Sequence, residues 1–321
     1  MTDVAGRVSG PFPIMPEDLP ALNVLFSDAF SERYRRDGMA GVRVPPLNPA
    51  IWRYAIEGAG AGAMLWRDGL GRIAAFNLAH ASGTEGWMGP LAVREEMQGR
   101  GLGRTIVRAG IEYLRAAGCT VIGLETMPRT MDNIGFYAAL GFIPGGLTIT
   151  LTVEATPATD HRPQLLSELG AAERAGVIAA AASLVREVRP GSDYSREIAL
   201  TLQHALGDVV LLRDDQGVLR GFALFHEMPL VEGRSREELR VLKLVLADQT
   251  AMPRMAEALA AQARRSGALR CALRVQGDYP TAFRALIARG AKVRWTDLRM
   301  TLTGFDETPA VTGVILSNWE I

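Results

Sequence analysis

The amino-acid sequence predicts an α/β protein in which one structural unit occurs twice. Three observations lead to this expectation. The chain has 321 residues, more than one hydrophobic core usually supports, so two domains are expected. Apolar strand patterns alternate with amphipathic helix patterns in both halves. Finally, segment 67–80 aligns without a gap with segment 213–226, and six of the fourteen positions are identical.

Each aligned segment is typical of a β-hairpin, because a turn containing Asp and Gly separates two apolar strands. The elements that follow also recur in the order strand, helix, strand, helix: 87–93, 104–117, 120–125 and 133–142 in the first half, and 242–246, 256–266, 270–275 and 281–289 in the second. Strict alternation over 147–153 predicts one more antiparallel strand. We therefore expect a first domain over 1–155, a linker over 156–163 and a second domain over 164–321.

The N-terminal part of the first unit predicts two helices, near 16–36 and 49–57. The Gly- and Pro-containing segment 38–49 joins them and is placed to lie over a substrate. The C-terminal segment 310–321 is apolar and aromatic enough to dock against the rest of the chain, at a place that the sequence does not give.

Bulk properties narrow the class of protein. Thirty-five basic residues balance 35 acidic residues, which disfavours nucleic acid as a partner. No apolar stretch of eighteen residues predicts a membrane span, and the N-terminus lacks a signal core. Cys119 and Cys271 are expected to be free thiols in a reducing compartment. We expect a cytoplasmic protein that is a monomer or a homodimer.

A glycine-rich loop between a strand and a helix predicts a ligand. Gly99, Gly101 and Gly103 remove side chains where the main chain must approach something closely. A helix starting at Gly103 or Arg104 leaves its first amides without partners, and its dipole favours an anion. Arg100 and Arg104 add positive charge, so the loop is suited to a diphosphate.

The spacing of this loop distinguishes three phosphate-binding families. A P-loop requires Gly-Lys-Ser/Thr, which is missing, and a dinucleotide fingerprint requires G-x-G-x-x-G followed by an acidic residue, for which Glu125 is poorly placed. The pattern Q/R-x-x-G-x-G/A, filled by Gln98, Gly101 and Gly103, resembles the acetyl-CoA loop of the GNAT (GCN5-related N-acetyltransferase) superfamily. About thirty residues later, 133–142 resembles the superfamily's N-x-x-x-Y-x-x-x-G-F motif.

The resemblance implies a mixed, mostly antiparallel sheet flanked by helices in each of two tandem units. It also implies acetyl-CoA as the co-substrate, without a metal. The implied CoA-binding residues are Leu91, Ala92 and Val93, whose strand splays from its neighbour, the loop residues Gln98, Gly99, Arg100, Gly101, Leu102, Gly103 and Arg104, and Asn133 and Phe136 of the second motif. Tyr137 would protonate the departing thiolate.

A general base is less well defined. Glu85 precedes the strand 87–93 and Glu125 ends the next strand, so both are candidates to take a proton from an ammonium. His80 is another candidate, but His226 matches it in the second copy, which favours a structural role.

Each candidate has a structural alternative. Tyr137 is also explained as a core aromatic residue, Asn133 as the N-cap of its helix, and Arg100 and Arg104 as surface charges.

The second copy lacks the groups that carry this chemistry. Segment 247–253 has no glycine, places Asp248 where phosphate would bind, and includes Pro253, which has no N–H. Leu286 stands at the position of Tyr137. We expect a degenerate unit that does not bind CoA and has a structural or substrate-shaping role.

The expected function is transfer of an acetyl group from acetyl-CoA to a primary amine of a small molecule, or to a peptide N-terminus, by direct attack in a ternary complex. Two alternatives stay open. One is a regulatory module that binds acyl-CoA without catalysis, which the presence of Tyr137 disfavours. The other is a purely structural pair of domains.

Overall fold

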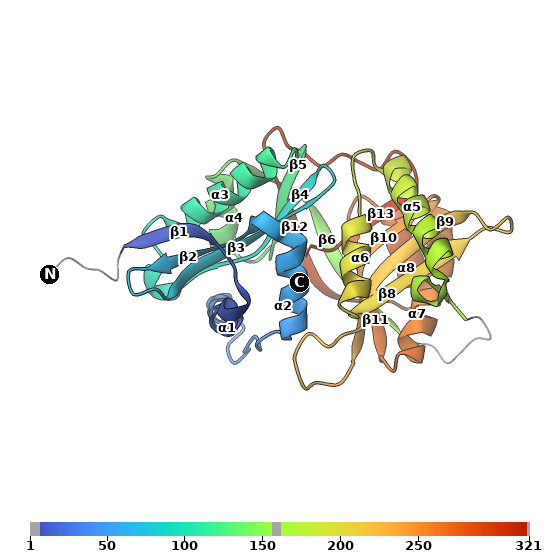
Figure 1. Cartoon of the computed structure of the whole chain (residues 1–321), viewed down its shortest axis with the longest axis horizontal. Helices are drawn as coiled ribbons and strands as arrows, with labels where there is room; N and C mark the ends of the chain where they lie inside the picture. The colour runs from blue at the N-terminus through green and yellow to red at the C-terminus, as the bar shows by residue number, and fades with distance from the viewer. Residues whose placement is uncertain (1–6, 156–161, 320–321) are drawn as a thin grey trace.

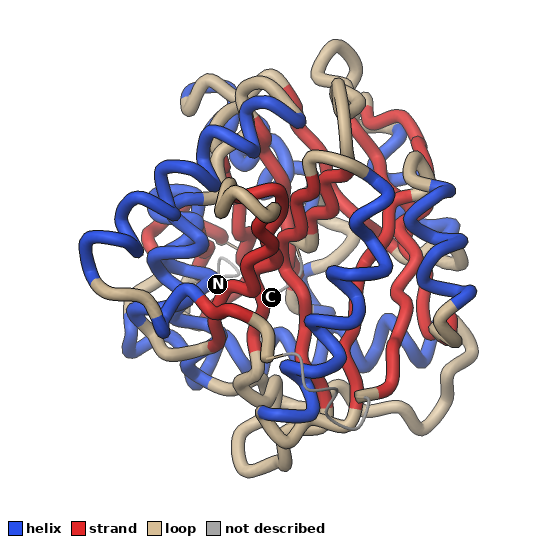
Figure 2. Tube along the Cα trace, turned by 90° about the vertical axis from the view of Figure 1, so that its right-hand side faces the viewer, coloured by secondary structure: helices blue, strands red, loops and turns tan. Residues whose placement is uncertain are grey.

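The computed structural model describes residues 7–155 and 162–319. Within these ranges the strands form one sheet of 13 strands that runs through both halves of the chain. Helices cover both faces of the sheet (Figure 1), and the view turned by 90° shows the strands between them (Figure 2). The architecture confirms the predicted α/β class and the mixed sheet flanked by helices.

Apart from a first strand that the sequence analysis did not predict, the first half follows the predicted order. Its elements are β1 (Val8–Pro13), α1 (Leu19–Arg36), α2 (Pro49–Ala59), β2 (Ala63–Asp68), β3 (Ile73–Ser82), β4 (Glu85–Val93), α3 (Leu102–Ala116), β5 (Val121–Thr126), α4 (Met131–Ala138) and β6 (Phe142–Glu154). Helix α3 begins at Leu102, so the predicted start at Gly103 or Arg104 is wrong by one or two residues. The difference arises because Gly101 already takes the N-cap position.

The second half repeats this order. Its elements are β7 (Gln164–Leu165), α5 (Ala171–Val188), α6 (Ser195–Gln203), β8 (Gly207–Arg213), β9 (Leu219–His226), β10 (Glu238–Leu246), α7 (Met252–Arg265), β11 (Arg270–Gln276), α8 (Pro280–Ala288), β12 (Lys292–Leu302) and β13 (Val314–Ser317). Residues 156–161 of the predicted linker lie outside the described residues.

Helix α3 packs on the sheet through one apolar face. Ile106, Val107 and Leu114 are fully buried against the strands. The helix approaches β3 and β4 closely at Gly110, where an added Cβ would lie 2.5 Å from the sulfur of Met88. Gly118 then ends the helix with φ of 81°, a conformation that favours glycine. This packing fixes the helix N-terminus at the end of β4.

The last long strand of each half lies in the sheet of the other half. Strand β12 pairs with β5 of the first half, and β6 pairs with β11 of the second half, each in antiparallel orientation. The two exchanged strands also pair with each other, so the order at the centre is β5, β12, β6, β11 (Figure 1). Each half therefore completes the sheet of the other. The division of the sequence into units at residues 1–155 and 164–321 stays a prediction.

Both cysteines are buried free thiols, as expected. Within the described ranges, no helix combines the length and the hydrophobicity that crossing a bilayer requires. The same residues contain no group of three or more His, Cys, Asp or Glu side chains arranged to hold a metal ion.

Candidate active site

The first half contains a gap between two parallel strands. Strands β4 and β5 pair from Glu85 with Val121 to Met88 with Leu124, and no pair follows. Beyond Met88, β4 stays paired only with β3, through Leu91, Ala92 and Val93, while β5 stays paired with β12 along its opposite edge. One edge of this stretch of β4 therefore faces the gap. This is the place where the resemblance puts the pantetheine arm of CoA, and that role stays a prediction.

The glycine loop lies at the end of this gap. Gly99 and Gly101 have φ of 73° and 84°, and nothing lies within 4 Å of the Cβ position of either residue. Their main chain is therefore open to a ligand. Gly101 is the N-cap of α3, so the first amides of the helix lack intrahelical acceptors and the positive end of the helix dipole lies here.

Charged and polar side chains around the loop fall into two groups. Arg100 and Arg104 are exposed, and neither forms an ion pair with any described residue. Gln98 is engaged instead: its amide donates to the carbonyl of Val93 at 3.0 Å and accepts from Arg36 at 3.4 Å. Gln98 thus ties the loop to the end of β4, while the two arginines remain available to an anion.

Helix α4 brings the second motif to the loop. An added Cβ at Gly103 would lie 3.3 Å from the Phe136 ring, so the absence of a side chain there lets α4 pack against the start of α3. Asn133 lies in the first turn and donates to Thr126 Oγ1 at 3.5 Å. The alternative that Asn133 is the N-cap is wrong, because Thr130 holds that position.

Tyr137 lies in the hydrophobic core of the first half. Its ring packs against Phe136 and Phe142, with centroids 5.2 and 6.1 Å away. Burial raises the pKa of Tyr137 to about 12. The phenol therefore keeps its proton at neutral pH and is a weaker acid than an exposed tyrosine. Such a group stabilises a nearby thiolate mainly by donating a hydrogen bond.

The two carboxylates predicted as general bases are both held by arginines of the second half. Glu85 contacts Arg189 at 2.6 Å, and Glu125 contacts Arg274 at 2.6 Å and Arg299 at 2.7 Å. Burial acts to raise the pKa of Glu125, but Arg274 and Arg299 outweigh it and hold that pKa below its usual value. The sequence gives no sign of these partners, which lie about 100 to 175 residues away. The ion pairs weaken the assignment of either residue as the base.

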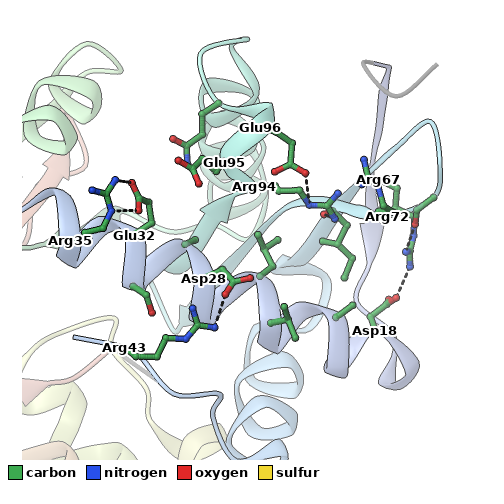
Figure 3. A pocket seen from close by; sticks show the side chains of 18 of the residues that line it. Asp18, Asp28, Glu32, Arg35, Arg43, Arg67, Arg72, Arg94, Glu95 and Glu96 are labelled. Carbon is green, nitrogen blue, oxygen red and sulfur yellow. Dashed lines mark hydrogen bonds and ion pairs between the residues drawn. The ribbon is translucent and has the colours of Figure 1, made fainter. Parts of the chain in front are cut away.

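A groove of about 890 Å³ begins beside the glycine loop, between α1, residues 41–43, the turn from β2 to β3, and residues 94–98 (Figure 3). Segment 38–49, predicted to lie over a substrate, contributes one wall. The arginines lining the groove are each paired with a carboxylate: Arg35 with Glu32, Arg43 with Asp28, Arg67 with Asp18, and Arg72 and Arg94 with Asp68. The groove is thus nearly balanced in charge and does not resemble a second phosphate site.

The corresponding gap of the second half is filled by the chain itself. Strands β10 and β11 pair only up to Arg240 and Ala272, and beyond this point β13 pairs with β10 instead. The side chain of Gln276 in β11 also bonds to the main chain of Ser317 in β13. The C-terminal segment 310–321, whose docking place the sequence did not give, therefore occupies the second gap through its strand β13.

The loop before α7 differs from the glycine loop as the sequence predicts. The carboxylate of Asp248 accepts the amide of Thr250 at 2.8 Å, so an internal acceptor already satisfies this amide. Pro253 lies in the first turn of α7, and Leu286 is buried where the first half has Tyr137.

Comparison with known proteins agrees with this geometry. Residues 25–142 of the 321 match the profile of the Acetyltransferase (GNAT) family, so this part of the chain is similar to GNAT domains. No curated protein sequence matches the chain.

Among solved structures, the fold is similar to a putative acetyltransferase from Pyrococcus horikoshii (15% identity, TM-score 0.66, covering 92% of this chain and 88% of that one). It is also similar to a tandem GNAT protein from the clavulanic acid biosynthesis pathway (13% identity, TM-score 0.60, covering 92% and 98%). A third similar structure is Saccharomyces cerevisiae N-myristoyltransferase with bound myristoyl-CoA (10% identity, TM-score 0.64, covering 96% and 84%). The chain has the fold of tandem GNAT proteins, and the family match supports acyl-CoA-dependent acyl transfer.

Proposed function

We propose that this protein is an N-acetyltransferase that moves an acetyl group from acetyl-CoA to a primary amine, either of a small molecule or of a peptide N-terminus. One observation carries the proposal: the gap between β4 and β5 leads directly to the open main chain of Gly99 and Gly101 at the start of α3. A long, narrow ligand with an anionic diphosphate fits this combination.

The residues present fit acetyl-CoA. The amides at the start of α3, with Arg100 and Arg104, would hold the diphosphate, and the free edge of β4 at Leu91, Ala92 and Val93 would hold the pantetheine arm. Gln98, Gly99, Gly101, Leu102, Gly103, Asn133 and Phe136 complete the proposed binding residues. Acetyl-CoA supplies the thioester whose carbonyl carbon accepts the amine.

The chain's own groups account for two further requirements of acyl transfer. Main-chain amides at the free edge of β4 would donate to the carbonyl oxygen, where negative charge develops. Tyr137 would donate to the sulfur as the thiolate leaves, and its retained proton suits that role. Direct attack by a neutral amine in a ternary complex needs no covalent intermediate on the chain.

We further propose that only the first half binds CoA, and that the second half is a degenerate GNAT unit with a structural and substrate-shaping role. The units correspond to residues 1–155 and 164–321 in sequence, with β6 and β12 exchanged in space. Asp248, Leu286 and the tail strand β13 in the second gap support this proposal.

Release of CoA thiol tests the proposal. The purified full chain, given acetyl-CoA and a panel of small primary amines and short peptides, is expected to release thiol with at least one acceptor. Tight acetyl-CoA binding without thiol release from any acceptor would favour the regulatory module. Absence of acetyl-CoA binding would favour the purely structural alternative.

A further inference from the structure

A small cavity lies where the two halves meet on the sheet face that carries α2 and α6. Its volume is about 40 Å³, enough for a few water molecules. Both halves contribute to its lining, through Tyr54, His80 and Ser82 of the first half and Glu197, Lys243 and Trp319 of the second.

Lys243 is an unusual residue in this chain. Of the 35 basic residues only Lys243 and Lys292 are lysines, and Lys243 is 2% exposed. Its ammonium lies 3.0 Å from the centroid of the Trp319 ring and donates to the carbonyl of Asn318 at 3.2 Å. Burial lowers the pKa of Lys243 to about 8, although Glu197 and Glu85 oppose this shift. Lys243 thus supplies one positive charge to the cavity at neutral pH.

Glu197, in the first turn of α6, is the carboxylate that lies in this cavity. One of its oxygens accepts a hydrogen bond from Ser82. The other oxygen, Oε2, is buried and has no hydrogen-bond partner among the described residues. A buried carboxylate oxygen without a partner is costly, so a water or a ligand donor is expected beside it.

The cavity adjoins the point where β4 leaves β5. His80 is the cross-strand partner of Trp87, which lies two residues before Gly89. Trp319 stacks on Trp87, with centroids 5.8 Å apart and planes 14° apart. The lining of the cavity therefore includes both the strand partner of Trp87 and the ring stacked on it, just before β4 leaves β5.

Glu197 differs from Glu85 and Glu125 in its charge environment. Those two form ion pairs with arginines. The groups around Glu197 are Lys243 on β10, Glu85 on β4, Tyr54 on α2, Tyr194 before α6 and Ser82 on β3, and the cavity is also lined by His80 on β3 and Arg196 on α6, whose guanidinium group donates to the carbonyl of Glu57. Burial raises the pKa of Glu197. The negative charge of Glu85 acts in the same direction, while Lys243 and the hydrogen bond from Ser82 act to lower this pKa. A carboxylate in these surroundings is a better proton acceptor than one held by two guanidinium groups.

We propose that Glu197, a residue of the second half, accepts the proton of the incoming ammonium through water in this cavity. The inference rests on the proposed acetyltransferase function. The ammonium loses one proton to Glu197, and the resulting amine forms the N–C bond as the C–S bond breaks. The second proton lost from nitrogen ends on the thiol, and Glu197 later returns its proton to solvent. The second half then contributes to the chemistry although it does not bind CoA.

Infrared titration of the full chain tests the acceptor without any amine. The infrared band of the protonated Glu197 carboxyl is identified by its absence in Glu197→Gln. As the pH is lowered, this band is expected to appear with a midpoint above about pH 4.3, the ordinary pKa of glutamate, and below about pH 7. A midpoint at or below the ordinary value, or a carboxyl still protonated at about pH 7.5, overturns the proposal. If Glu197→Gln does not fold, Glu197→Asp is used instead, and the band that shifts in this variant is assigned to the carboxyl of residue 197.

Kinetics give the second arm, with an amine that releases thiol in the wild type. Glu197→Gln is expected to lower kcat/KM at pH 7 by at least about tenfold, and the deficit should narrow to about threefold by about pH 9.5, because the amine then loses its proton unaided. Glu197→Asp should retain part of the activity, and Glu187→Gln, an exposed residue of α5, should change nothing. An equal deficit at every pH, or none, overturns the proposal. Failure of the proposed function is distinct: no amine releases thiol in the wild type, while the infrared titration still decides the state of Glu197.

Discussion

Ser317 of β13 is the antiparallel partner of Lys243 in β10, at a position where β10 has already separated from β11. The tail strand thus lies in the second half where the first half has an open gap. The duplicated fold has two equivalent gaps between strands, and the chain occupies one of them with its own main chain.

We therefore expect one molecule of acetyl-CoA to bind per chain, measured by isothermal titration calorimetry. Gly101→Asp should abolish binding, because it places bulk and negative charge where the diphosphate belongs. Gly118→Asp is the matched control: it lies at the other end of α3, has nearly the same φ (81° against 84°) and also has open space at its Cβ position. Two bound molecules, or equal binding by both variants, would contradict the assignment of the site.

Tyr137→Phe should lower kcat by at least about tenfold and leave the Kd for acetyl-CoA nearly unchanged. The reason is that the hydroxyl acts on the leaving sulfur, while the ring supplies the packing against Phe136 and Phe142. Tyr113→Phe removes a hydroxyl that bonds to the carbonyl of Ala59, outside the gap, and serves as the control. Unchanged turnover in Tyr137→Phe would remove Tyr137 from the mechanism.

Glu125→Gln should destabilise the protein by roughly 1–3 kcal/mol, because Arg274 and Arg299 lose one buried carboxylate but keep Asp297 and Glu307 as partners. Chemical denaturation measures this, and Glu112→Gln on the exposed face of α3 should have little effect. The pKa of Glu125 is lowered in the folded protein, so the carboxylate stabilises at neutral pH. That contribution is lost as the pH falls below the ordinary glutamate pKa of about 4.3. The difference in free energy of unfolding between wild type and Glu125→Gln should therefore disappear in this acid range. A stability difference that persists in acid would show that the charge of Glu125 is not the cause of the destabilisation.

The two halves should not fold separately. Without β12, β5 and β6 of the first half have no strand between them, and without β6 the second half exposes the edge of β11. Residues 1–161 and 162–321 produced alone are expected to lack a cooperative thermal transition, and to co-elute as a 1:1 complex when produced together. A cooperatively melting monomer of either half would refute this.

Much of the candidate site follows from local sequence. The glycine loop, the start of α3 and the helix carrying Asn133 and Tyr137 were predictable because turn glycines, helix ends and apolar periodicity are encoded within a few residues. The predicted start of α3 was one or two residues too late, because Gly101, with positive φ, serves as its N-cap. The spacing of the glycines alone does not distinguish this arrangement from a longer loop.

The general base was not predictable in this way. Glu85 and Glu125 are ordinary carboxylates in the sequence, and only the fold brings Arg189, Arg274 and Arg299 of the second half against them. Glu197 carries no motif, so no sequence signal points to it.

The sequence alone was sufficient to predict the duplicated α/β architecture and the open glycine loop before α3, since both depend on short-range spacing. Folding decided the exchange of β6 and β12, the filling of the second gap by β13 and the pairing of the buried charges. These features depend on contacts between segments far apart in the chain. Strand edges and buried charges are stabilised only when they are paired, and the segments that pair with them come together only in the folded molecule.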